Sequence, residues 1–106
     1  MEFFVYVLVC RDARRHRTYV GWTTDPDRRL GEHNAGTGAR STRGRTWVLL
    51  HVERLGSRRE AMSREWHLKR DRSLRKRLVE DWLGAGPAAW RDYRPRLPNA
   101  GRSGPV

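Results

Sequence analysis

The segment Thr18–Asn34, with the sequence TYVGWTTDPDRRLGEHN, decides the fold because it passes from a strand to a helix within a few residues. Two β-favouring residues precede Gly21, so the segment predicts a strand that ends near this glycine. Asp25 stands directly before Pro26. Aspartate caps the first turn of a helix and proline suits its first position, so a helix is expected to begin there.

The predicted helix covers Pro26–Ala35 and presents a basic pair of side chains next to its apolar side. At about 100° per residue, Leu30 marks the inward side, and Arg29 and His33 lie beside it. The strand before the helix carries Tyr19. We therefore expect Tyr19, Arg29 and His33 to converge where the strand meets the helix.

An apolar strand precedes this segment and forms a hairpin with it. Phe3–Cys10 is apolar on both faces, which is typical of a strand in the middle of a sheet. Arg17–Gly21 returns as its partner, and a turn centred directly after Asp12 places Tyr6 opposite Tyr19 on one face. The residues themselves leave two interpretations open: core packing with the hydroxyls at the rim, or a catalytic pair.

The composition restricts the class of protein. The chain has 106 residues, enough for one modest core, and its 23 Lys+Arg against 12 Asp+Glu give a net charge of +11. The arginines cluster around predicted loops and helix faces, which favours a nucleic acid over an anionic membrane surface as partner. Cys10 is the single cysteine, so no intrachain disulfide or cysteine-built zinc site is expected, which suits a reducing cytoplasm. The longest apolar run is too short to span a membrane.

The segment Gly36–Arg45, GTGARSTRGR, is predicted to be a surface loop, because it contains no apolar residue larger than alanine. Its guanidinium groups, hydroxyls and glycine backbone can contact phosphates, although a flexible polar loop is the alternative. The phosphate contacts are expected from Arg40, Thr42, Arg43 and Arg45.

Further elements complete a predicted domain over residues 1–84. Trp47–Val52 reads as a third strand, in which His51 is expected to be satisfied inside the fold or at a sheet edge. Ser73 is expected to cap a last helix, Leu74–Leu83, whose inward side chains are Leu74, Leu78 and Leu83. The Pro-, Gly- and Arg-rich segment 85–106 is predicted to be a partly disordered tail, from which Trp90 and Tyr93 could dock onto the body.

A second helix, predicted over Ser57–Arg70, carries an acidic side chain in its apolar stripe. The sequence SRRE at its start fits a capping box. Glu65 falls inside the stripe, where a carboxylate costs several kcal/mol unless a cation or donors meet it. Two interpretations stay open: an ion pair with Lys69 or a core-facing arginine, and a metal ligand. The apolar stripe is formed by Ala61, Leu68, Met62 and Trp66.

The ordered spacing of these motifs resembles the GIY-YIG nuclease family over Phe3–Arg77. It rests on Phe4-Val5-Tyr6, Tyr19-Val20-Gly21, Arg29, His33-Asn34 and Glu65. The likeness is greatest to small stand-alone bacterial members and to the structure-specific branch. Valine replaces both isoleucines of the family motif and Phe4 replaces its first glycine, changes that hydrophobic packing can absorb.

The resemblance implies an α+β fold with a three-stranded antiparallel sheet flanked by helices, and a metal-dependent endonuclease. Glu65 is then expected to hold one divalent cation, Mg²⁺ or Mn²⁺, with waters filling most of its shell. Arg29 is expected to bind the non-bridging phosphate oxygens. Tyr6 and Tyr19 are expected to flank the attacking water. Tyr6 is the preferred general base, a role that needs its phenol to be made more acidic by Arg29 or the metal. His33 is the alternative base.

The resemblance also implies the partner. We expect cleavage of DNA that leaves a 5′-phosphate, at flaps, branches or single strands rather than at a base sequence, in DNA repair or recombination. RNA and a protein partner for substrate choice stay open, although the sequence requires neither. Asn34 is expected to fix the helix end and, with Lys69, to join the nucleic-acid contacts. The alternative is a non-catalytic basic DNA- or RNA-binding module with a vestigial nuclease site.

Overall fold

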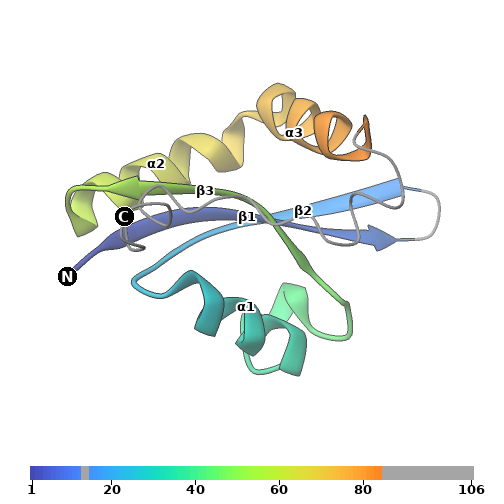
Figure 1. Cartoon of the computed structure of the whole chain (residues 1–106), viewed down its shortest axis with the longest axis horizontal. Coiled ribbons are helices and arrows are strands. Elements are labelled where there is room, and N and C mark those ends of the chain that lie inside the picture. The colour runs from blue at the N-terminus through green and yellow to red at the C-terminus, as the bar shows by residue number, and fades with distance from the viewer. Residues whose placement is uncertain (13–14, 85–106) are drawn as a thin grey trace, which may run out of the picture.

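The chain folds into a three-stranded antiparallel sheet with the strand order β2-β1-β3, confirming the predicted α+β class. The computed structural model describes residues 1–12 and 15–84; the predicted tail, with Trp90 and Tyr93, lies outside them. Figure 1 shows α1 on one face of the sheet and α2 and α3 on the other. The elements are β1 (Phe3–Asp12), β2 (Arg15–Thr23), α1 (Pro26–Ala35), a 3₁₀ turn (Arg40–Thr42), β3 (Val48–Leu55), α2 (Arg58–Arg70) and α3 (Arg72–Gly84). No helix in the described part is long and apolar enough to cross a membrane.

β1 is the central strand and is buried on both faces, as its apolar sequence predicts. Alternate side chains point to opposite faces of a strand. Val5, Val7 and Val9 therefore pack in one cluster with α2 and α3. Phe4, Tyr6 and Leu8 pack in a second cluster, to which Leu30 of α1 contributes. In this second cluster Phe4 is 4% exposed, so it fills the core and does not crowd the surface.

The predicted hairpin register is wrong by two residues. Tyr6 pairs with Gly21, and Tyr19 pairs with Leu8, because the ladder continues to Asp12 before the chain reverses. β2 is correspondingly longer than predicted at both ends. A shift of two residues leaves every side chain on its face, since the strand period is two. The two tyrosines therefore lie on one face as predicted, but as diagonal neighbours.

Side-chain caps set where the helices begin. The carboxylate of Asp25 accepts the N–H of the residue three positions on at 3.1 Å, and α1 has the predicted bounds. The Ser57 hydroxyl caps α2 in the same way, also at 3.1 Å. The expectation that Ser73 caps the last helix is wrong. Asp71 does so instead, by accepting the backbone N–H of the residue three positions on at 3.0 Å.

The inward faces of α2 and α3 are narrower than the sequence predicts. Ala61 and Leu68 are fully buried against the sheet. Three side chains expected to face inward are instead exposed by 50%, 52% and 39%, namely Met62, Trp66 and Leu83. The helices meet the sheet along a thin strip, so residues at the margins of an apolar stripe remain in solvent.

β3 is an edge strand whose polar side chains form a small ion-pair cluster with α2. His51 Nε2 lies 2.8 Å from a Glu53 carboxylate oxygen, and Arg64 Nε donates to the other oxygen at 2.7 Å. These hydrogen bonds lower the pKa of Glu53 to about 2, and the hydrogen bond with His51 has the larger effect. The expectation that His51 is satisfied at a sheet edge is thus confirmed.

Candidate active site

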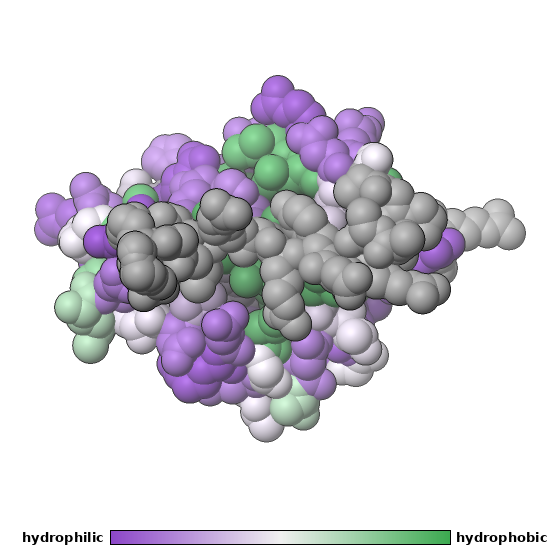
Figure 2. Space-filling view, viewed as in Figure 1, coloured by the Kyte–Doolittle hydropathy of each residue, from purple (hydrophilic) through white to green (hydrophobic). Residues whose placement is uncertain are grey.

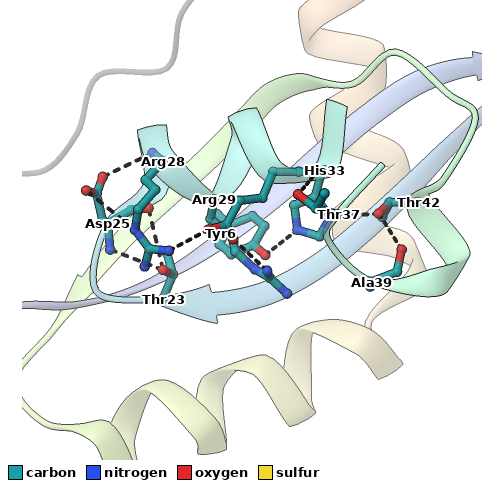
Figure 3. A network of polar contacts seen from close by, with 10 residues as sticks. Tyr6, Thr23, Asp25, Arg28, Arg29, His33, Thr37, Ala39 and Thr42 are labelled. Atoms are coloured by element: carbon teal, nitrogen blue, oxygen red, sulfur yellow. Dashed lines mark hydrogen bonds and ion pairs between the residues drawn. The ribbon is translucent and has the colours of Figure 1, made fainter. Parts of the chain in front are cut away.

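The candidate site surrounds the Tyr6 hydroxyl, between α1 and the sheet. Figure 3 shows Arg29 and His33 reaching from α1 towards Tyr6. The Tyr6 ring centroid lies 5.9 Å from that of His33 and 6.3 Å from that of Tyr19. The structure therefore brings these four sequence-predicted residues together on one face of the sheet.

Gly21 gives the Tyr6 ring its place. A methyl group at position 21 would lie 2.5 Å from Tyr6 Oη and 2.7 Å from Cζ, well inside van der Waals contact. Tyr6 is only 2% exposed, so its ring cannot move aside freely. A side chain at position 21 is therefore incompatible with this position of the phenol.

Gly21→Ala is expected to destabilise the protein by about 1–3 kcal/mol, because the new methyl displaces a packed ring. It should also lower any cleavage activity that depends on the phenol position. Urea unfolding measures the first effect. Gly31→Ala is the matched control: position 31 lies in α1 with open space around it, so this change should stabilise by about 0.5–1 kcal/mol. An equally stable Gly21→Ala variant would contradict the described packing.

A chain of buried hydrogen bonds links the phenol to the loop after α1. Tyr6 Oη lies 2.8 Å from His33 Nε2, and His33 Nδ1 lies 2.7 Å from Thr42 Oγ1. Thr42 Oγ1 lies 2.7 Å from the carbonyl oxygen of Ala39. A carbonyl only accepts, so the Thr42 hydroxyl donates its one proton there. His33 Nδ1–H must then donate to Thr42, which leaves Nε2 unprotonated to accept the proton of Tyr6.

The electrostatics of this chain favour a neutral imidazole. Burial, and then the positive charge of Arg29, lower the pKa of His33 below its ordinary value. The ring is fully buried. His33 is therefore neutral near pH 7 and can accept a proton at Nε2.

The expectation of an acidified Tyr6 phenol is wrong for the protein alone. Burial raises the pKa of Tyr6 well above its ordinary value, with the neighbouring Tyr19 adding to this effect. A hydrogen bond from Arg29 and its charge act in the opposite direction but are smaller, and the negative charge of Glu65 raises the pKa further. Tyr6 therefore keeps its proton unless a base accepts it.

Arg29 is held beside the phenol and remains within reach of solvent. Its guanidinium donates to Glu32 at 2.8 Å, and the side chain is 31% exposed. Hydrogen bonds with Glu32, and to a lesser degree with Tyr6, raise the pKa of Arg29. The inward direction predicted for Arg29 is confirmed, and the group is fixed where an anion can reach it.

The predicted role of Thr42 as a surface phosphate contact is wrong. Its side chain is fully buried, and Trp47 Nε1 donates to its carbonyl oxygen at 2.8 Å. Arg40 and Arg43 in the same loop are exposed, as expected. The sequence predicted an exposed Thr42, whereas the structure buries it. A small polar side chain in a polar segment carries no signal of burial.

Asn34 anchors the end of α1 to the start of β3. Its Oδ1 accepts the Trp47 N–H at 2.6 Å, and its Nδ2 donates to the Trp47 carbonyl at 3.1 Å. The predicted role in fixing the helix end is confirmed. With both ends of the amide bonded to backbone, Asn34 holds the loop in place.

Glu65 lies on α2, which packs on the sheet face opposite α1 (Figure 1). One carboxylate oxygen lies 3.3 Å from Lys69 Nζ, and the side chains are 22% and 51% exposed. The ion pair with Lys69 expected as one interpretation is thus present, yet it is open to solvent. The negative charge of Glu65 also raises the pKa of the Tyr6 phenol, by less than burial or Tyr19 does.

The donor set at Glu65 fits a hard divalent cation that keeps most of its water. Among residues 1–12 and 15–84, no group of three His, Cys, Asp or Glu side chains could hold a metal ion. A single accessible carboxylate without a protein cage is how Mg²⁺ and similar ions are commonly bound. Glu65 is therefore the residue of α2 that could hold such an ion.

Comparison with known proteins found one family model and several relatives similar to this chain. Residues 2–77 match the family model described as the GIY-YIG catalytic domain. A UPF0213 protein of Natronomonas pharaonis is 47% identical over 85 residues, which cover 78% of this chain and 96% of the relative. A UPF0213 protein of Enterococcus faecalis is 43% identical over 83 residues, covering 76% and 88%. The NMR structure of a UPF0213 protein from Bacillus halodurans is 37% identical, covers 87% of this chain and 95% of its own, and has a TM-score of 0.46.

Proposed function

Because this chain belongs to the GIY-YIG family, whose catalytic domain implies nuclease-type activity, we propose that it is a metal-dependent endonuclease that hydrolyses DNA phosphodiester bonds. The observation that supports this proposal most is the phenol of Tyr6, which can pass a proton to neutral His33 while Arg29 lies beside it. A basic docking module has no need of a buried, directional proton path.

In the proposed reaction, water attacks phosphorus, and its proton passes to Tyr6 Oη as the proton of Tyr6 passes to His33 Nε2. The new P–O bond forms on the 5′-phosphate product, the bond to the 3′-oxygen breaks, and that oxygen takes a proton from solvent. The imidazolium formed returns its proton through the phenol. Arg29 stabilises the charge on the non-bridging oxygens, and Tyr19 flanks the water.

The metal is proposed to be Mg²⁺ or Mn²⁺, held by Glu65. When bound, such an ion polarises the phosphate and neutralises charge on the leaving oxygen. The exposed ion pair with Lys69 supports this assignment, because hydrated Mg²⁺ can reach the carboxylate without unfolding the helix.

The substrate is proposed to be a DNA flap, branch or single strand, recognised by shape and charge, in repair or recombination. The domain over residues 1–84 holds the nuclease, and we assign phosphate contacts to Arg40, Arg43, Arg45 and Lys69. Arg40 and Arg43 are exposed on the loop beyond α1, where they can meet the DNA backbone without reading bases.

The proposal is tested by incubating the purified chain with labelled single-stranded, duplex, flap and junction DNAs and matching RNAs. Each is combined with Mg²⁺, Mn²⁺ or EDTA. Metal-dependent cleavage that leaves 5′-phosphates at flaps or junctions is the expected result. Binding without cleavage of any substrate, with either metal, would instead establish a non-catalytic nucleic-acid-binding module.

The pH dependence of single-turnover cleavage is expected to distinguish the bases. The pKa of His33 is lowered from its ordinary value of 6.5, so the imidazole is neutral at pH 6.5 and above. It becomes protonated, and so stops acting as a base, only at a lower pH. The rate should therefore fall on an acid limb below about pH 6.5 and be flat up to about pH 8.5. A tenfold rise per pH unit from 7 to 9 would show instead that a free Tyr6 phenolate is the base.

A further inference from the structure

A basic groove runs between β2 and α3, on the sheet face opposite α1. It has a volume of about 420 Å³. Four cationic side chains line it, namely Arg15, Arg72, Arg75 and Lys76, and the one carboxylate among the lining residues is that of Glu80. In Figure 2, hydrophilic side chains surround a hydrophobic patch at the top of the molecule, where α3 lies. The groove contains none of the residues assigned above to the reaction or to phosphate contacts.

Arg75, which lines this groove, is fixed in place by the protein itself. Its Nη1 donates to the carbonyl oxygens of Leu68 and Lys69, the latter at 2.7 Å, and its Nε donates to Thr18 Oγ1 at 3.1 Å. These bonds cap the end of α2 and tie it to β2. The two N–H donors on Nη2 have no hydrogen-bond partner among the described residues, so a pre-oriented donor pair remains for an external acceptor.

The other cations of the groove, on β2 and α3, are exposed to solvent. Arg15, Arg72 and Lys76 are each exposed. None of the three side chains pairs with another side chain within residues 1–11 and 15–84. Arg72 and Lys76 are one turn apart on α3, and so project from the same side of the helix. Unpaired cations on two facing elements around a fixed guanidinium suit a polyanion with regularly spaced phosphates.

The groove and the phenols lie on opposite faces of the sheet and meet at the edge strand β2, which carries both Thr18 and Tyr19. β2 is an edge strand, and Thr18 in the groove precedes Gly21, the residue against Tyr6, by three positions. That separation corresponds to roughly 10 Å along the strand. One strand of a DNA duplex advances about 3.4 Å per nucleotide, so a backbone that passes round the β2 edge reaches the groove at least about three nucleotides from the phenols.

We propose that this groove binds the sugar-phosphate backbone of the duplex arm that flanks the cleaved bond. The inference rests on the proposed nuclease function for the position of the DNA, and it adds a second contact that holds the substrate without reading its sequence. Each phosphate contact that a cation makes releases counterions, so the groove should contribute to the salt dependence of binding.

The test compares two double variants of equal charge change. Arg72→Gln with Lys76→Gln removes two groove cations, and Arg59→Gln with Arg77→Gln removes two exposed cations elsewhere on α2 and α3. Binding of a labelled 20-base-pair duplex bearing a flap is measured in EDTA between 50 and 300 mM NaCl. The groove variant should reduce the slope of log K against log salt by about 2, with the control unchanged.

The outcomes separate this inference from the proposed nuclease function. The proposal that the groove binds DNA is contradicted if both double variants change the slope equally, or if neither does. This holds even when the wild type cleaves DNA. A single-turnover cleavage rate at saturating DNA should be the same in the groove variant and the wild type. If the groove variant reduces the slope of log K against log salt but the wild type cleaves no DNA, the groove contact is confirmed and the nuclease function is refuted. Arg15→Gln, on the opposite wall, should reduce the slope by about 1 and gives an independent reading.

Discussion

Glu65→Gln is expected to abolish metal-dependent DNA cleavage and to leave DNA binding in EDTA unchanged. The substitution keeps the size of the side chain and removes the charge that would hold the cation. Since a metal ion contributes several kcal/mol of transition-state stabilisation, the single-turnover rate should fall by about three orders of magnitude. The measurement is nicking of a flap substrate in Mg²⁺, with affinity in EDTA measured in parallel.

Two controls sharpen this prediction. Glu2→Gln removes a carboxylate of the same type from a surface pair with Arg54, at 3.4 Å, and should leave the rate unchanged. Lys69→Gln breaks the same ion pair as Glu65→Gln from the other side. If Glu65 served only that pair, both changes would have the same small effect. Wild-type cleavage by the Glu65→Gln variant would show that the metal site is wrong.

His33→Ala is expected to cost about 3–5 kcal/mol of unfolding free energy and to abolish cleavage. The ring is fully buried between two hydroxyl groups. Its removal leaves a cavity and takes a hydrogen-bond partner from both Tyr6 and Thr42, and each of these losses is costly inside a protein. Urea unfolding gives the stability change, and the rate is measured on whatever folded protein remains.

Thr42→Val separates the proton path from stability, because it keeps the shape of the side chain and leaves the His33 ring in place. The lost hydroxyl removes the acceptor that sets the imidazole tautomer, at a cost of about 1–3 kcal/mol. The folded variant should cleave more slowly and with an altered acid limb. Thr37→Val, an exposed threonine in the same loop, is the control and should change neither quantity. Wild-type cleavage by Thr42→Val would show that Thr42 does not position His33.

Much of the fold could be read from local sequence, with errors that have physical causes. The hairpin register was wrong because nothing in the charged turn sequence fixes where the ladder stops. The error did no harm to the site, since a shift of two residues preserves the face on which both tyrosines lie. The outward positions of Met62 and Trp66 were missed for another reason: a helical wheel gives the direction of a side chain but not the width of the surface that covers it.

By itself, the sequence determined the central strand, the start and end of α1, and the convergence of Tyr6, Tyr19, Arg29 and His33. These features depend on period, caps and propensity, which act over a few residues. Only the tertiary structure decided that Thr42 is buried against His33, that burial keeps the Tyr6 phenol protonated, and that a basic groove forms between β2 and α3. Each of these depends on which distant segments meet and how much water they exclude, and no local pattern of residues records that.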